Sequence, residues 1–281
     1  MNPNMEICRI SEDDILRSEH IRNIVQGNML SINSCSTNEM KIPKTIVQFW
    51  HNLSDIPDDV SVCLNSWEPL KNLGFVRVVF DNTGARNFIF KNFGEDYLKA
   101  YDRCHHPAMR CDYFRLCYIL MHGGFYIDAD ELYQGADCSR LFEDSKLKIQ
   151  PLCYDVATEG MIKTDRFIMN HENCSTWIFY VNNNPLIAPP NHPVIQLALN
   201  RSTKILLQCK SETLNIQSTT GPGNLSASLV LHSLNSAITG NPIDFYILPD
   251  WESISISPWP LSYRKDVRNW RLWNNSDIWN Y

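Results

Sequence analysis

An apolar helix pattern, two glycines, a short strand pattern and two aspartates follow one another in the middle of this chain. Apolar side chains recur at helical spacing over residues 107–122, and the glycine pair at 123–124 predicts the end of that helix. The run 125–127 predicts a buried strand, with Asp128 and Asp130 at its carboxyl end. Open α/β sheets bind ligands at this edge, so the sequence predicts a site around the two acids.

Two more apolar runs predict neighbouring strands of the same sheet. The first is residues 45–50 within KIPKTIVQFWHN, and the second is FVRVVF at 75–80. The segment 61–73 between them is long enough for a crossover helix, which predicts a strand-helix-strand unit and a largely parallel sheet. The Asp-Asn-Thr-Gly sequence at 81–84 predicts a turn that closes the second strand.

The rest of the chain predicts further helices and strands. We expect one or two short polar helices within 1–29, a strand at 177–183, a loop at 184–190, helices at 192–208 and 225–234, and a strand at 245–250. No shift in composition marks an internal boundary, so we expect one α/β domain over 42–281. An N-terminal helical and loop extension, 1–41, would precede it, and a lid around 259–281 would end it.

Charge and hydropathy argue against several classes of protein. The 281 residues carry a net charge of -6 and no long basic tract, which argues against a nucleic-acid partner. No apolar run reaches the about 18 residues of a membrane span, and the charged first residues do not resemble a signal peptide. We therefore expect a cytoplasmic protein without a membrane span. The cluster Cys104, His105, His106 and Cys111 lacks the paired spacing of a zinc site.

The two acids after the predicted strand can be interpreted in two ways. Carboxylate oxygens suit Mg²⁺ or Mn²⁺, and a cation that bridges a diphosphate would stabilise the charge of a leaving group. Alternatively, Asp128 and Asp130 only cap a loop, because such triplets are common. Upstream, Asp112 and Arg115 lie three residues apart on one face of the predicted helix, where they could also form a plain salt bridge.

Taken together, these residues resemble a known family. The spacing of Asp112, Arg115, Gly123, Gly124, Tyr126, Asp128 and Asp130 is similar to that of the DXD-containing sugar-binding glycosyltransferases. That superfamily includes fungal initiating mannosyltransferases, α-1,4-galactosyltransferases and the glucosyltransferase domains of large clostridial toxins. IPKTIVQFWHN resembles the first strand of the family, and LIAPPNHPVI and TTGPG resemble later segments, so the resemblance covers about 42–279.

The resemblance implies a GT-A fold, a single Rossmann-like domain with a mostly parallel sheet that binds a nucleotide sugar and Mn²⁺ or Mg²⁺. Asp112 and Arg115 would hold hydroxyls of the donor sugar, and Trp50 would stack on the base unless it is a core aromatic. Asp130 would bind the metal directly, and Asp128 would contact the ribose, or the metal through water. The implied donor-binding residues are Gln48, Trp50, Asp112, Arg115, Gly124, Tyr126, Asp128 and Trp279, and the implied catalytic residues are Asp112, Arg115, Asp130 and Asn183.

Near the C-terminus the sequence departs from the family. Relatives supply a late metal ligand there, a histidine or an acid, whereas this chain has Arg271 in the place of the histidine. An arginine cannot ligate a cation, but it could neutralise a diphosphate through bidentate hydrogen bonds. Asn274, Asn275 or Ser276 could instead offer an oxygen to the metal. The tryptophan-rich tail is either a lid over the donor or a segment that packs on the domain.

The implied reaction is the transfer of a hexose or hexosamine from a UDP- or GDP-sugar to a hydroxyl of a glycan, natural product or protein, with retention of configuration. Asn183 would stabilise the cationic sugar, although asparagine runs such as 182–184 are also common in turns. A nucleotide-sugar-binding module without catalysis is one alternative. A DxD phosphatase is another, but Leu132 stands where those enzymes have Thr or Val.

Overall fold

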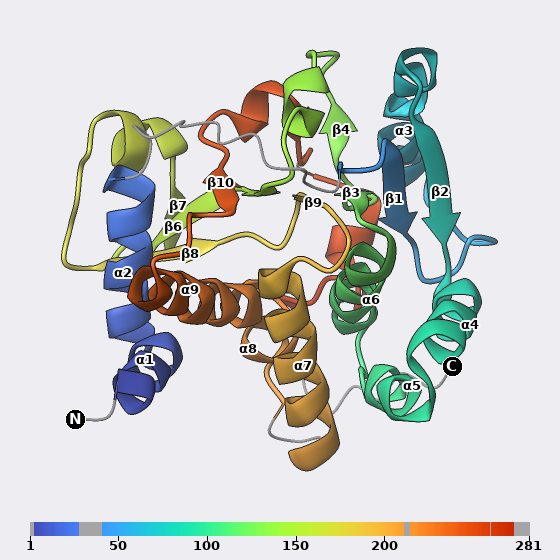
Figure 1. Cartoon of the computed structure of the whole chain (residues 1–281). Helices are drawn as coiled ribbons and strands as arrows, with labels where there is room; N and C mark the ends of the chain where they lie inside the picture. The colour runs from blue at the N-terminus through green and yellow to red at the C-terminus, as the bar shows by residue number, and fades with distance from the viewer. Residues whose placement is uncertain (1–2, 28–40, 211–213, 259, 273–281) are drawn as a thin grey trace.

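The computed structural model describes residues 3–27, 41–210, 214–258 and 260–272 (Figure 1). Its α-helices are α1 (Pro3–Glu12), α2 (Asp14–Gly27), α3 (Asp58–Ser66), α4 (Asn82–Phe93), α5 (Glu95–Asp102), α6 (Pro107–His122), α7 (Pro193–Gln208), α8 (Ile216–Thr219) and α9 (Pro222–Thr239). Its strands are β1 (Thr45–Phe49), β2 (Val76–Phe80), β3 (Gly124–Tyr126), β4 (Leu132–Tyr133), β5 (Leu147–Ile149), β6 (Pro151–Asp155), β7 (Gly160–Ile162), β8 (Trp177–Val181), β9 (Leu186–Ala188), β10 (Phe245–Ile247) and β11 (Ser255–Ile256). The short helical turns are η2 (Glu68–Leu73), η3 (Ser139–Phe142), η4 (Asp165–Met169), η6 (Trp251–Ser253) and η7 (Ser262–Lys265).

A six-stranded sheet, in the order β10-β5-β9-β3-β1-β2, forms the centre of the fold. β1 pairs in parallel with both β2 and β3, and β10 pairs in parallel with β5. β9 runs antiparallel to its two neighbours, β3 and β5. The expected α/β class with a mostly parallel central sheet is therefore confirmed, and β9 is the reversed strand within it.

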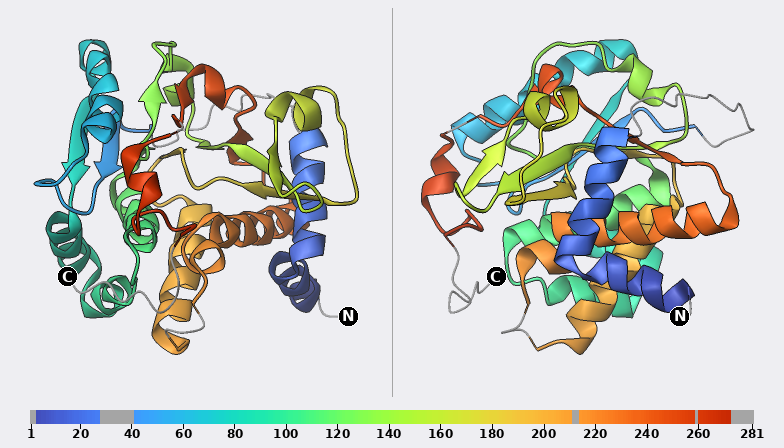
Figure 2. Two further views of the ribbon diagram at one scale, coloured as in Figure 1. Left: turned by 180° about the vertical axis from the view of Figure 1, so that it is seen from behind. Right: turned by 90° about the vertical axis from the view of Figure 1, so that its left-hand side faces the viewer.

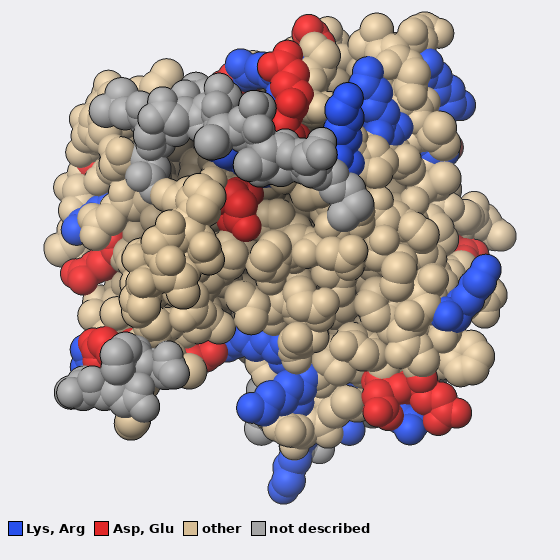
Figure 3. All heavy atoms as spheres, in the orientation of Figure 1, with Lys and Arg blue, Asp and Glu red and all other residues tan. Residues whose placement is uncertain are grey.

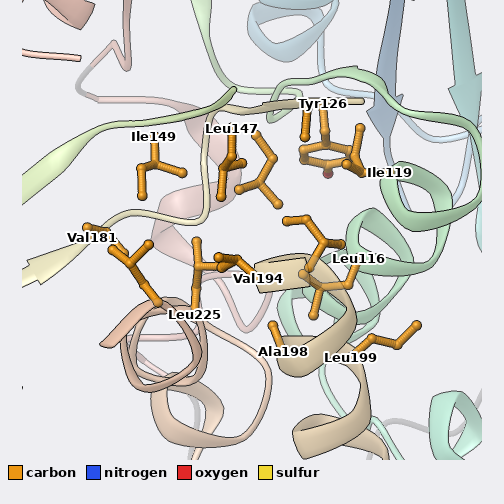
Figure 4. Close-up of a cluster of buried hydrophobic side chains, with 14 of the residues drawn as sticks. Leu116, Ile119, Tyr126, Leu147, Ile149, Val181, Val194, Ala198, Leu199 and Leu225 are labelled. Carbon is orange, nitrogen blue, oxygen red and sulfur yellow. The ribbon is translucent and has the colours of Figure 1, made fainter. Parts of the chain in front are cut away.

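Both faces of this sheet are buried, as is usual for parallel strands. Tyr126 points into the larger core, which it shares with α6, α7 and α9 (Figure 4). The neighbouring Phe125 and Ile127 belong to a second core on the opposite face, with Trp67 and Trp251. Because side chains alternate along a strand, this three-residue run fixes the sheet between two apolar layers.

The first two helices pack on α9, and α2 also packs on β8. Ile21, Ile24 and Val25 of α2 are buried members of the larger core. Ser18 of the same helix accepts a hydrogen bond from the backbone N–H of Phe179 in β8, at 2.9 Å. Figure 2 shows α2 against the end of the molecule that contains β6, β7 and β8, with α1 beside α9. α2 packs on a three-stranded sheet, β7-β6-β8, that the sequence did not predict.

The expected turn at 81–84 is wrong, because the chain begins α4 there. Asp81 is the N-cap, and its Oδ1 accepts from the backbone N–H of Gly84 at 2.7 Å. Asp, Asn and Gly favour turns and helix N-termini for the same reason, since a short polar side chain can bond to nearby backbone N–H groups. The helix α5, which follows α4 at Gly94, was also missed from the sequence.

The glycines that precede the DXD strand are required by the backbone. Gly123 has φ +65° and Gly124 has φ +115°. A Cβ at Gly124 would lie 2.8 Å from the carbonyl oxygen of Thr45, and one at Gly123 would lie 2.7 Å from Pro190. Only glycine therefore lets α6 turn directly into a strand that pairs with β1.

Two surface properties complete the description. On the face shown in Figure 3, acidic and basic side chains lie in separate small groups between larger areas of other residues. Across the described parts of the chain, no helix has both the length and the apolar character needed to cross a bilayer.

Candidate functional site

A pocket of about 450 Å³ lies at the carboxyl ends of β1 and β3. Its walls come from the end of β1, from α6, from the DXD turn at 128–131, from the segment after β8 and from the C-terminal segment. The volume is in the range of small-molecule sites. The site predicted from the sequence at this edge of the sheet is therefore a real concavity.

Arg115 joins the two predicted acids of the donor site. Its Nη2 lies 2.7 Å from Asp128 Oδ1 and 3.0 Å from Asp112 Oδ1, and its Nη1 donates to the backbone carbonyl of Asn183 at 2.7 Å. The Arg115 side chain is only 3% exposed. The guanidinium also lies 4.5 Å from the ring centroid of Tyr126. One buried cation thus pairs with two carboxylates and links the helix to the end of the strand.

Asp112 is a buried carboxylate held by three side chains. Besides Arg115, it accepts from the Asn183 amide nitrogen at 2.8 Å and from the Thr220 hydroxyl at 3.3 Å. Burial raises the pKa of Asp112 to about 6, although the Arg115 charge acts in the opposite direction. The predicted partners Asp112, Arg115 and Asn183 therefore form one contact network.

Asp128, the first acid of the motif, is surrounded by donors. Its Oδ1 accepts from Arg115, from the Tyr126 hydroxyl at 3.4 Å and from the Cys111 thiol at 3.6 Å. Its backbone N–H donates to the Asn184 side-chain oxygen at 2.9 Å. Burial raises the pKa of Asp128, and the Arg115 charge counteracts this.

Asp130, the second acid, contacts the C-terminal part of the chain. Its Oδ2 accepts from the Tyr263 hydroxyl and from Arg264 Nη2, each at 2.6 Å. Tyr263 also packs edge-on against Trp50, with ring centroids 5.4 Å apart. No sequence signal pointed to Tyr263 or Arg264, because more than 130 residues separate them from the DXD motif.

Glu131 is a further acid of the site that the sequence analysis did not select. It is buried, and its carboxylate contacts the Asn184 side-chain nitrogen at 3.0 Å and the Ser255 hydroxyl. Burial, reinforced by the nearby Asp130 charge, raises the pKa of Glu131 to about 8. Asn184 thereby connects Glu131 to the backbone of Asp128. The position directly after the DXD triplet was the signal that could have revealed this residue.

The structure places the other predicted donor residues in different ways. Trp50 lines the pocket but is only 7% exposed, and its indole nitrogen donates to the Asp55 carbonyl at 3.1 Å. Gln48 is buried and accepts from Arg77 at 3.1 Å, outside the pocket lining. Gly124 and Tyr126 lie behind the lining residues, where they shape β3 and support Asp128. Trp279, Asn274 and Ser276 lie outside the described residues.

The carboxylates of the DXD motif could hold a divalent cation only with help from other oxygens. The hydrogen bonds of Asp128 fall on Oδ1 and those of Asp130 on Oδ2, so each keeps its second oxygen for another ligand. The described residues contain no cluster of three or more His, Cys, Asp or Glu that could surround a metal. Mg²⁺ and Mn²⁺ sites of one or two carboxylates are normally completed by phosphate oxygens, and this donor set fits that kind of site.

Two residues of the cysteine and histidine cluster near the start of α6, Cys104 and His106, have structural contacts. The His106 ring caps α6 by accepting from the Ala108 N–H at 3.0 Å, and its other nitrogen lies 3.0 Å from the Val267 carbonyl. Burial lowers the pKa of His106 to about 4. The Cys104 thiol donates to the Ala100 carbonyl.

The fold and the site together define an α/β protein with an acidic, guanidinium-bridged ligand pocket at the carboxyl edge of its sheet. Residues 27–136 match the family model described as "Glycosyltransferase sugar-binding region containing DXD motif". The resemblance to the DXD sugar-binding glycosyltransferases that the sequence predicted is therefore confirmed over residues 27–136.

Individual proteins agree with this family. The chain is 33% identical over 90 residues to "Uncharacterized glycosyltransferase L373" of Acanthamoeba polyphaga mimivirus. This alignment covers 32% of this chain and 36% of that protein. It is 26% identical over 196 residues to "Putative glycosyltransferase HOC1" of Saccharomyces cerevisiae, covering 66% of this chain and 47% of that protein. The aligned regions thus span less than half of each curated relative. The solved structure titled "PaToxG Glycosyltransferase" superposes over 95% of both chains with a TM-score of 0.47 and 13% identity.

Proposed function

We propose that this chain transfers a hexose or hexosamine from a UDP- or GDP-sugar to an acceptor hydroxyl on a glycan, a natural product or a protein. The observation that carries the proposal is the convergence of Asp112, Arg115, Asp128, Asp130 and Asn183 on one pocket. These side chains come from α6, from the end of β3 and from the segment after β8. The family match of residues 27–136 supports the same reaction class.

The chemistry follows from where charge develops. In sugar transfer the anomeric carbon becomes cationic while the leaving diphosphate becomes more negative. Asp112 and Arg115 would hold sugar hydroxyls at one end of the pocket. Because the Asn183 amide nitrogen donates to Asp112, its amide oxygen is the atom that would face the cationic sugar.

We infer that transfer retains the anomeric configuration. The bond from the anomeric carbon to the diphosphate breaks, a bond to the acceptor oxygen forms on the same face, and the acceptor proton passes to the departing phosphate. This route needs no carboxylate nucleophile. The contacts of Asp128 are consistent with this route, because its Oδ1 accepts hydrogen bonds from Arg115, Tyr126 and Cys111. The same hydrogen bonds disfavour a phosphatase in which Asp128 attacks phosphorus.

Divalent-metal assistance is part of this proposal. Asp130 would bind Mn²⁺ or Mg²⁺ directly, and Asp128 would do so through water or bind the ribose. The metal, when bound, would supply Lewis-acid stabilisation of the diphosphate charge. The chain's own contribution would be to orient both carboxylates, which it does through Arg115 for Asp128 and Tyr263 for Asp130.

A donor screen tests the proposal. The full chain is incubated with a panel of UDP- and GDP-sugars, with and without Mn²⁺, and free nucleotide is measured by mass spectrometry. Release from one donor class supports a transferase. Binding measured by calorimetry without any release would favour a nucleotide-sugar-binding module, and phosphate release from simple esters would favour a phosphatase. A cytoplasmic location stays a prediction, which fractionation of cells that express the tagged chain would check.

A further inference from the structure

One wall of the pocket, which adjoins the DXD turn at Asp130, is built from the C-terminal segment and carries three arginines. Arg264, Arg268 and Arg271 of this segment all line the same pocket as Asp112, Asp128 and Asp130. In the left-hand view of Figure 2 the segment lies beside α6, and the contact between His106 and the Val267 carbonyl agrees with this placement. The pocket therefore has an acidic wall and a basic wall.

The basic wall is held in place by contacts with distant parts of the chain. The Ser262 hydroxyl donates to Asp59 of α3 at 2.9 Å, and the Tyr263 ring packs against Trp50. Within the segment, the buried Asn269 donates to the Arg264 carbonyl at 2.8 Å. These contacts fix the backbone that carries the three arginines.

The three guanidinium groups are in different local environments. Arg264 lies 2.6 Å from Asp130 and 2.7 Å from the Ser257 hydroxyl, and its side chain is 11% exposed. Arg268 pairs with Asp266 at 2.7 Å and is 20% exposed. Arg271 lies over the ring of Trp270, 4.5 Å from its centroid. Arg264 thus offsets the charge of Asp130 and Arg268 that of Asp266, while the Arg271 guanidinium adds positive charge to the same wall.

A diphosphate fits this arrangement electrostatically. A dianionic group beside Asp128 and Asp130 is repelled unless positive charge is supplied, and the described residues supply it through arginines. Guanidinium groups also match phosphate oxygens in bidentate geometry and remain charged at every physiological pH.

We propose that Arg264, Arg268 and Arg271 form the diphosphate-binding wall of this pocket, so that a nucleoside diphosphate binds without a divalent cation. The inference rests on the proposed function, because it takes the donor to be a nucleotide sugar. It deepens that function by naming the arginine side chains that would bind the diphosphate leaving group. The cation would then assist transfer of the sugar but would not be required for binding of the nucleotide.

The test is calorimetric titration of the full chain with UDP and GDP in EDTA and again in Mn²⁺, with uridine and guanosine as ligands that lack phosphate. The wild-type chain is expected to bind one of the diphosphates in EDTA. The Arg268→Gln and Arg271→Gln variants should each weaken that binding by about ten-fold or more, since charge-assisted hydrogen bonds are lost. Binding of the matching nucleoside should stay unchanged.

Two further variants keep the result interpretable. Arg86→Gln, which removes a half-exposed arginine paired with Asp102 on the surface, should bind the diphosphate like the wild type. Arg264→Gln should also weaken binding in EDTA, and if that variant does not fold, the Arg268 and Arg271 variants decide the question alone.

The possible failures differ from one another. Diphosphate binding that requires Mn²⁺ and is unaffected by Arg268→Gln and Arg271→Gln would overturn the arginine wall and leave the proposed transferase standing. Failure of both UDP and GDP to bind in either buffer would overturn the proposed function together with this inference.

Discussion

The buried Arg115 on α6 and the partly exposed Asp128 after β3 form an ion pair, with 2.7 Å between Nη2 and Oδ1. The same guanidinium lies 3.0 Å from Asp112, one turn earlier on the helix. Gly123 and Gly124 join α6 directly to β3, and the Arg115 ion pairs connect the same helix and strand end a second time. This relationship links the stability of the fold to the shape of the pocket.

Replacement of Arg115 by Gln should destabilise the protein strongly. It leaves the buried Asp112 and the partly exposed Asp128 without their cation, and breaking the buried Arg115–Asp112 pair costs about 3–5 kcal/mol. Urea unfolding followed by circular dichroism measures the change. The exposed pair Arg86 and Asp102 provides the control, since Arg86→Gln should change stability by only about 0–1 kcal/mol. Equal effects of the two substitutions would show that the Arg115 network is not structural.

Gly124→Ala should be much more damaging than Gly135→Ala. Both glycines have positive φ, at +115° and +82°, so alanine is strained by about 1–2 kcal/mol at either position. At Gly124 the new Cβ would also lie 2.8 Å from the Thr45 carbonyl, whereas at Gly135 nothing among the described atoms lies within 4 Å. Thermal denaturation of the two variants should show the difference, and equal melting temperatures would contradict the steric reason given for Gly124.

The buried Glu131 should make stability depend on pH. Its pKa is about 8 in the folded chain, against 4.5 as the ordinary value, so between these values the folded state binds a proton that the unfolded state has lost. The contribution of Glu131 to stability should therefore fall as pH rises from 5 towards 8, by at most about 1.4 kcal/mol per pH unit. Glu131→Gln should flatten the slope in urea titrations at pH 5, 6.5 and 8. A slope in the variant that matches the wild type would remove Glu131 as its source.

Trp50→Ala should raise the donor KM if the indole stacks on the base of the nucleotide. Base stacking on an aromatic ring contributes about 1–3 kcal/mol, which corresponds to roughly 5-fold to 150-fold in KM. The assay must run well below the melting temperature of the variant, because Trp50 is only 7% exposed and its replacement by alanine also leaves a cavity. An unchanged KM would assign Trp50 to the core alone.

Much of the fold could be predicted from local patterns. The helix expected at 107–122 is α6, the strand expected at 75–80 is β2 apart from its first residue, and the helix expected at 192–208 is α7 apart from its first residue. These elements combine strong apolar periodicity with clear capping or turn residues. The missed elements are short strands such as β5 and β7, whose three residues carry too little pattern to be distinguished from loops.

The site was predictable on one wall only. Asp112, Arg115, Asp128 and Asp130 lie within 19 residues of one another, so their spacing alone pointed to one site. Tyr263 and Arg264 reach Asp130 from the far end of the chain, and Ser255 reaches Glu131 in the same way. Contacts of such sequence separation depend on the tertiary fold, which no local pattern encodes. The predicted metal ligands Asn274 and Ser276 stay predictions.

The central claim is that Asp130 serves sugar transfer rather than only a structural bond to Arg264. The most direct test is nucleotide release from the donor identified in the screen, measured by mass spectrometry for the wild type and for Asp130→Asn with matching circular dichroism spectra. We expect release by the wild type and a loss of roughly 100-fold or more in the variant, because the carboxylate that would hold the cation at the diphosphate is removed. Near-normal release by a folded Asp130→Asn protein would contradict the claim.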